Sequence, residues 1–320
     1  MRSRDPVSVI EAAYAVELEQ PAWLGGIARA AEAVSGASSG ALAFLYDASR
    51  DDWVEPLELV NRELPATFIQ GIFDKTMPAE ERKTMVGVYR SLGFTGLRSS
   101  PLPPELLETY REVLDAHHMG DVLCMNAIDP THRGCLVLVP VPKLRASVRQ
   151  ARLWRRVGAH VAAGVRLRRS LNELTAEAEP TEKAEAILTS NGRIEHAVGP
   201  ATTDTAREQL QEGLVRMERA RSRAVNGEEA VALWKALVDG RWSIVEHFER
   251  DGKRYYLAHR NDPALAPDRA LTQRERQVVA YTELGYSNKL IAYALGVSTS
   301  NVSTLLTAAR RKLGHGGGAV

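Results

Sequence analysis

Cysteine and long apolar runs are both scarce in this sequence. Two cysteines, Cys124 and Cys135, are too few for a disulfide framework in a chain of 320 residues. No apolar run is long enough to span a bilayer, and the N-terminal segment lacks the apolar core and the cleavage site of a signal peptide. These absences predict a cytoplasmic protein without a membrane partner.

The residue patterns that usually carry catalysis are also missing. The sequence contains no Gly-rich phosphate loop, no nucleophile elbow and no pair of carboxylates that stands out from the background. His117, His118, Cys124 and Cys135 match no standard spacing of metal ligands, and buried cysteines and loop histidines without such a role are commoner. We therefore expect no enzyme, no catalytic residue, no metal site and no cofactor.

The net charge of +1 hides a segregation of charge along the chain. Residues 1–142 hold 12 basic and 20 acidic side chains, whereas residues 143–172 hold nine basic ones and no acidic one. The last segment, residues 266–320, has seven basic and three acidic side chains. Attraction to a polyanion would therefore come from one of the two basic segments.

The first segment, residues 1–145, mixes the periodicities of helices and strands. Helices are expected at Ile10–Leu18, Trp23–Val34 and Glu105–Ala116, and strands at Gly40–Tyr46 and Gly134–Val141. Because proline cannot donate a ladder hydrogen bond, Pro140 and Pro142 indicate that the second strand lies at a sheet edge or ends there. Helices flanking an antiparallel sheet fit this order.

A long helix is predicted within residues 146–176. Its apolar and small residues recur at spacings of three and four, which is typical of a seam between helices. This seam consists of Leu153, Val157, His160, Gly164, Leu167, Leu171 and Leu174. It predicts a homodimer with two such helices side by side. The arginines on the other faces are either solvated or in contact with DNA phosphates or an acidic segment of a partner subunit.

A small α+β domain is predicted for residues 181–262. One strand pair turns at Asn191-Gly192, because this dipeptide accepts the positive φ angles of a two-residue turn. A second pair, Trp242–Phe248 with Lys253–Ala258, turns at Asp251-Gly252. Helices near Asp204–Ala224 and Glu228–Val238 separate the two pairs.

The final unit, residues 266–314, is predicted to form three short helices with clear start and stop signals. The expected N-cap residues are Thr272, Ser287 and Ser298, and the expected stops are Gly285, Gly296 and Gly314. Glu275 lies three residues after the first cap, the spacing of a capping box.

The apolar positions of these helices fit one small shared core. They are Val278, Val279, Leu284, Ile291, Leu295, Val297, Val302, Leu306, Ala309 and Leu313. The outer face of the third helix is then Ser300, Asn301, Ser303, Thr304, Thr307, Ala308 and Arg311. A short helix, a tight glycine turn and a longer helix with a polar face fit a major groove. The surrounding basic residues suited to phosphates are Arg274, Arg276, Lys289, Arg310, Arg311 and Lys312.

The same run resembles the LuxR-type DNA-binding domain over residues 271–314 without gaps. The matching elements are T-x-R-E at Thr272–Glu275, S-N-K-x-I-A at Ser287–Ala292, L-G-V-S at Leu295–Ser298 and R-K-L-G at Arg311–Gly314. The resemblance implies double-stranded DNA as the partner. The DNA-binding residues that it implies are Lys289, Ser300, Asn301, Ser303, Thr304, Thr307 and Arg311.

The sequence departs from this family in two respects. Ser303 and Leu305 occupy positions where the family usually has lysine and histidine, so the groove face is less basic and less polar. The residues after Gly314 are His315–Val320, which do not form the fourth helix that pairs two such domains in the family. Dimerisation is therefore expected to come from another part of the chain.

The N-terminal part lacks the acidic pocket of a receiver domain and the Trp, Tyr and Asp-Pro order of acyl-homoserine-lactone sensors. Residues 1–145 loosely resemble a GAF-type sensor domain, and residues 181–262 loosely resemble a PAS-like fold. The expected class is thus α+β, with GAF-like and PAS-like sensory domains joined by a long helix and followed by an all-α helix-turn-helix domain.

The function expected from this sequence is that of a bacterial transcription regulator. Its C-terminal helices would bind promoter DNA under the control of an N-terminal sensory region, which responds to an unknown ligand or protein signal and acts on RNA polymerase. The alternative is a protein-interaction module that modulates other regulators and whose DNA-binding unit has degenerated. The alternative is favoured by Ser303, Leu305 and the missing fourth helix. DNA binding is favoured by the helix caps, the shared apolar core and the basic residues that surround the outer face of the third helix.

Overall fold

The computed structural model describes residues 5–37, 40–70, 77–91, 93–144, 147–173, 183–222, 227–234, 242–250, 253–263, 265 and 271–313. The chain divides into two compact units. Unit 1 comprises Met1–Ile128 and His132–Val165, and unit 2 comprises Asp129–Thr131 and Arg166–Val320. Each unit contains an antiparallel sheet with helices, so the predicted α+β class is confirmed.

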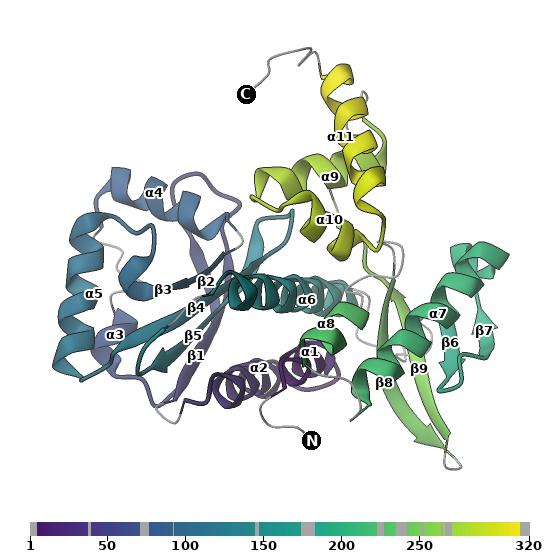
Figure 1. Cartoon of the computed structure of the whole chain (residues 1–320), viewed down its shortest axis with the longest axis horizontal. Helices are drawn as coiled ribbons and strands as arrows, with labels where there is room; N and C mark the ends of the chain where they lie inside the picture. Colours follow the sequence, from purple (N-terminus) through teal and green to yellow (C-terminus); the bar gives the residue numbers. More distant parts are fainter. Residues whose placement is uncertain are drawn as a thin grey trace. The chain divides into compact units, whose positions relative to one another are not determined.

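Unit 1 is built on a five-stranded antiparallel sheet with the strand order β2-β1-β5-β4-β3 (Figure 1). Its strands are β1 (Ala41–Asp47), β2 (Glu55–Arg62), β3 (Gly93–Gly96), β4 (Asp121–Ile128) and β5 (Arg133–Val141). Its helices are α1 (Val7–Tyr14), α2 (Gln20–Ser35), α3 (Ala66–Gln70), α4 (Ala79–Tyr89), α5 (Pro104–Ala116), the 3-10 turn η2 (Leu97–Ser99) and the first part of α6 (Val148–Glu173). Local sequence patterns predicted α1, α2, α5, β1 and β5 with small shifts of their ends, together with α6, but not the other elements.

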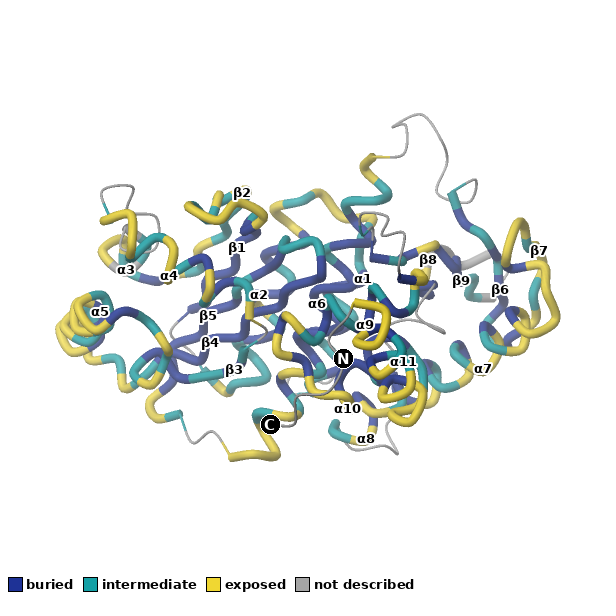
Figure 2. Tube along the Cα trace, turned by 90° about the horizontal axis from the view of Figure 1, so that it is seen from above, coloured by how far each residue is buried: buried dark blue, intermediate teal, exposed yellow. Residues whose placement is uncertain are grey.

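Helices cover both faces of this sheet. Figure 1 shows α2 and α6 on one side and α3, α4 and α5 on the other. On the α6 side, Trp154 stacks on Phe94 of β3 with the ring centroids 5.8 Å apart. Because both faces are covered, the first six residues of β1 are all buried, which explains its uninterrupted apolar sequence (Figure 2).

The position of β5 corrects the expectation of an edge strand. β5 pairs with both β1 and β4, so it lies inside the sheet. The pairing with β1 ends at Leu138, however, and Pro140 is matched only to Val122 of β4. A proline is tolerated there because its missing N–H faces no second strand. The strand does end at Val141, as the prolines indicated.

The central part of the heptad-like seam of α6 is buried inside the chain, whereas Leu153 and Leu171 are half-buried. Val157 and His160 have no exposed surface. A Cβ added to Gly164 would lie 2.4 Å from the carbonyl oxygen of Ala13, so this glycine allows α1 and α6 to pack closely. The prediction that these central positions join two copies is therefore wrong, because they already pack inside the same chain. Leu174, its last member, lies outside the described residues.

Unit 2 contains a four-stranded antiparallel sheet with the order β7-β6-β9-β8. The strands are β6 (Ala186–Thr189), β7 (Ile194–Ala197), β8 (Trp242–Arg250) and β9 (Lys253–Arg260). The helices are the second part of α6, α7 (Asp204–Arg221), α8 (Gly227–Leu233), α9 (Gln273–Glu283), α10 (Asn288–Leu295), α11 (Thr299–Lys312) and the 3-10 turn η3 (Gly199–Thr202). Among the described residues no single helix could cross a membrane by length and composition, and only α10 with α11, bent by 106°, pass that test as a pair.

The first hairpin of unit 2 differs in detail from the predicted two-residue turn. Gly192 has a φ of +86°, but Asn191 is not among the residues with positive φ. The Gly192 N–H donates to the Thr189 carbonyl at 2.8 Å, and the Thr189 N–H donates to the Arg193 carbonyl at 2.9 Å. These bonds describe a turn closed by a left-handed glycine, in which the Asn191 side chain accepts bonds instead of adopting positive φ.

Candidate nucleic-acid interface

Helix α9 begins at a complete capping box. The Thr272 hydroxyl accepts a hydrogen bond from the Glu275 N–H at 3.3 Å, and the Glu275 carboxylate accepts one from the Thr272 N–H at 2.7 Å. The same carboxylate accepts bonds from Lys312 Nζ at 2.7 and 2.8 Å. The bond from Lys312 is the main cause that keeps the pKa of Glu275 below its ordinary value. Glu275 thus joins the start of α9 to the end of α11.

Helices α10 and α11 form a bent pair around a glycine turn. Ser287 and Ser298 cap the two helices by accepting bonds from the N–H groups of Leu290 and Asn301. Gly296 ends α10 with a φ of +70°, a left-handed conformation that suits glycine. The two helices are bent by 106° relative to each other, within the range of helix-turn-helix motifs.

The core between α9, α10 and α11 follows the sequence prediction at most positions, but Val279 and Val297 are only half-buried. Val278, Ile291 and Val302 are fully buried, and Leu306 is 7% exposed. Leu313, in contrast, is 39% exposed, so the prediction that it is buried is wrong. The reason is that α11 ends at Lys312, and Leu313 is its C-cap residue, beyond the last turn that packs into the core.

The opposite face of α11 is exposed and rich in hydroxyl groups. Its exposed residues include Ser300, Asn301, Ser303, Thr304, Thr307 and Arg311, while Ala308 is half-buried. The hydroxyls of Thr304 and Thr307 each donate to the carbonyl four residues earlier, at 3.1 and 2.9 Å. Since a hydroxyl oxygen can still accept, these side chains are suited to the amino groups of adenine and cytosine.

Three basic side chains remain suited to phosphates. Lys289 at the start of α10 and Arg310 and Arg311 near the end of α11 are exposed. Lys312 is instead held by Glu275, which corrects its expected role at phosphates. Arg274 and Arg276 are half-buried, and they bond to Gln277 and to the Leu271 carbonyl.

A buried ionic cluster that was not predicted from the sequence lies elsewhere in unit 2. The Arg166 guanidinium, with 2% of its side chain exposed, lies 3.4 Å from the Asp129 carboxylate, which is 1% exposed. Arg166 Nε donates to the carbonyl and the side-chain oxygen of Asn261 at 3.1 and 3.0 Å. Burial raises the pKa of Tyr281 in α9, and the nearby positive charge of Arg166 opposes that rise. The cluster therefore links the β4–β5 loop, α6, the end of β9 and α9.

A second link joins α10 to α8 and to Trp234, which follows α8 directly. The Tyr293 hydroxyl lies 2.5 Å from the Val231 carbonyl and 2.7 Å from the Trp234 carbonyl. Both links use surfaces of α9 and α10, and neither touches the exposed face of α11. The sequence contained a hint of the first cluster, because three arginines, Arg166, Arg168 and Arg169, fall in a stretch without acidic neighbours.

Capped helices, a bend of 106° and an exposed polar face together define a helix-turn-helix DNA-binding unit. Residues 269–317 match the family model described as bacterial regulatory proteins, luxR family. This confirms the predicted resemblance: the C-terminal region is a LuxR-family DNA-binding domain, the domain of a transcription regulator. No curated protein matched the chain.

Proposed function

We propose that this protein regulates transcription by placing α11 in the major groove of promoter DNA. The observation that carries the proposal is the solvent-exposed polar face of α11 on a capped helix-turn-helix that belongs to the LuxR family. Ser300, Asn301, Ser303, Thr304 and Thr307 would contact base edges from this face.

Lys289 and Arg311 would fix the position of the domain on the DNA through phosphates. Their exposed cations come from two different helices, as expected for contacts on either side of a groove. Hydroxyl groups make fewer and weaker bonds to bases than lysine or arginine. We therefore expect modest specific affinity for one copy, and two copies on one operator would raise it. Such pairing would have to use a surface other than the buried central part of the α6 seam.

We further propose that the N-terminal region controls DNA binding. Residues 1–145 would act as a GAF-like sensor and residues 181–262 as a PAS-like domain. The long helix of residues 146–176 connects these two domains, and the DNA-binding domain follows at residues 266–314. Two observations support this proposal. The loop that begins at Asp129 directly follows β4 of the first sheet, and its carboxylate pairs with Arg166 close to α9. The regulated partner would be RNA polymerase.

The alternative is a module that binds other regulators without binding DNA. It is favoured by Ser303 and Leu305 at positions where the family carries lysine and histidine, and by the pairing of Lys312 with Glu275. These features leave fewer cations near the groove face than the sequence suggested.

Binding of the full chain to a promoter fragment across a salt series tests the proposal. Each lost phosphate contact reduces the slope of log affinity against log salt by roughly one unit. Lys289→Ala and Arg311→Ala should each show this reduction, with a similar loss of affinity on promoter and scrambled DNA.

Arg207→Ala is the matched control, because Arg207 is an exposed arginine on α7 of the same unit. It should leave the slope unchanged. If neither Lys289→Ala nor Arg311→Ala differs from the wild type, the assigned interface is wrong. If the wild type binds no DNA at low salt, the interaction-module function replaces it.

A further inference from the structure

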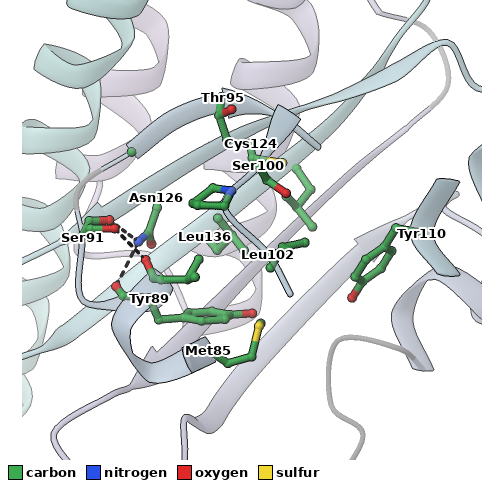
Figure 3. A pocket seen from close by; sticks show the side chains of 14 residues that line it. Met85, Tyr89, Ser91, Thr95, Ser100, Leu102, Tyr110, Cys124, Asn126 and Leu136 are labelled. Atoms are coloured by element: carbon green, nitrogen blue, oxygen red, sulfur yellow. Dashed lines mark hydrogen bonds between the residues drawn. The ribbon is translucent and has the colours of Figure 1, made fainter. Parts of the chain in front are cut away.

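Unit 1 contains a cavity between its sheet and the helices α4 and α5. Its volume is about 110 Å³. The floor consists of two cross-strand pairs on neighbouring strands, Cys124 with Leu138 and Asn126 with Leu136. Residues from α4, β3, the loop before α5 and α5 itself form the remaining wall (Figure 3). This cavity lies on the face of the sheet opposite to α2 and α6.

The lining determines the charge of any occupant. None of the described residues that line the cavity is an acid, a lysine, an arginine or a histidine. The one buried amide, Asn126, is already satisfied, because its NH₂ group donates to the carbonyls of Tyr89 and Ser91 and its oxygen accepts from Tyr46. Burial raises the pKa of the Cys124 thiol, so this side chain is neutral as well. A charged molecule would lose its hydration here without a counter-ion.

The size and the chemistry of the wall favour a single ring. An engineered apolar cavity of about 150 Å³ stays dry and binds benzene. The cavity of this chain is somewhat smaller, but Met85 lies in its wall, and methionine adapts easily to an occupant. Two tyrosine rings and two sulfur atoms line the space, and both groups make favourable contacts with aromatic rings.

One polar group in this wall, the Tyr89 hydroxyl, has no partner among the residues that the structure describes. Tyr89 is 7% exposed, and its ring packs edge-on against Tyr46 with the centroids 4.8 Å apart. Among the described residues, no hydrogen bond is formed by the Tyr89 hydroxyl. Figure 3 shows this hydroxyl beside the sulfur atom of Met85. Burial raises the pKa of Tyr89, so the group remains a neutral donor. This hydroxyl is not among the fully buried unpartnered polar atoms of the described residues, so it is open to the cavity, where a ligand oxygen can accept its hydrogen bond.

We propose that this cavity is a binding site for an uncharged monocyclic aromatic molecule that carries a hydroxyl group, which bonds to Tyr89. Binding itself is independent of DNA recognition, and only its effect on transcription would rest on the proposed function. The two can therefore fail separately.

Calorimetry or ligand-observed NMR of the full chain with phenol, benzene and benzoate tests this site. Phenol and benzene should bind, and benzoate should not, because its charge finds no partner. Tyr89→Phe removes a single oxygen atom. It should weaken phenol binding about two- to tenfold, the effect of one net hydrogen bond, and leave benzene binding unchanged.

Two further variants complete the design. Leu138→Phe fills the floor of the cavity and should abolish binding of both neutral probes. Tyr255→Phe, in β9 of the other unit, is the matched control and should change neither. The proposal is overturned if neither phenol nor benzene binds at millimolar concentration, if benzoate binds as well as phenol, or if Tyr89→Phe weakens phenol and benzene equally.

Discussion

Replacing Arg166 by methionine should lower the stability of unit 2 by about 3–5 kcal/mol, because it leaves the Asp129 carboxylate buried without its main counter-ion. Asp129 is 1% exposed, and the Arg166 side chain is 2% exposed. Arg166 also donates two bonds to Asn261, whose own NH₂ group donates to Ser243. Hydrogen exchange measured by mass spectrometry over residues 242–263 and 271–313 reports this loss locally.

Two controls separate the ionic cluster from a general effect of losing an arginine. Arg155→Met changes an exposed arginine on the same helix and should cost less than about 0.5 kcal/mol. The double variant Arg166→Met with Asp129→Leu should recover much of the loss, since replacing both partners of a buried ion pair by apolar groups is often tolerated. If Arg166→Met exchanges like the wild type, this cluster does not stabilise unit 2.

Leu306→Ala should destabilise the DNA-binding domain by about 2–5 kcal/mol, the usual range for a leucine truncated in a core. Leu306 is 7% exposed, and it lies on the buried side of α11 with Val302 and Ala309. The expected result is faster hydrogen exchange across residues 271–313, with little change in unit 1.

Leu313→Ala is the matched control on the same helix end. Leu313 is 39% exposed, so its truncation should cost less than about 1 kcal/mol. Equal losses of stability for the two variants would show that the core extends to the end of α11. Such a result would contradict the difference in exposure between Leu306 and Leu313.

The C-terminal domain was largely predictable because its signals are local. Each helix there starts at a Ser or Thr cap, and left-handed glycines follow α9 and end α10, so the sequence alone located all three helices. The exposed face of α11 followed from helical periodicity. Its role in DNA binding, and the individual roles of Lys289, Thr304 and Thr307, remain predictions.

The remaining features depend on contacts between residues far apart in the sequence. The seam of α6 has the spacing of a dimer helix, but Ala13, far away in the chain, packs against Gly164. Glu275 pairs with Lys312 and Arg166 with Asp129 across 37 residues in both cases. Local patterns show that such residues are charged or apolar. They do not show which partner the fold supplies.

The central claim is that α11 reads DNA sequence, and selection from a pool of random duplexes tests it most directly. At low salt the wild-type chain should enrich a defined sequence and bind it at least about tenfold more tightly than a scrambled duplex. Thr304→Ala and Thr307→Ala should change the enriched sequence more than the bulk affinity, because these side chains lie on the exposed face of α11 and carry no charge. Binding without enrichment, or identical sequences enriched by the wild type and both variants, would contradict the claim.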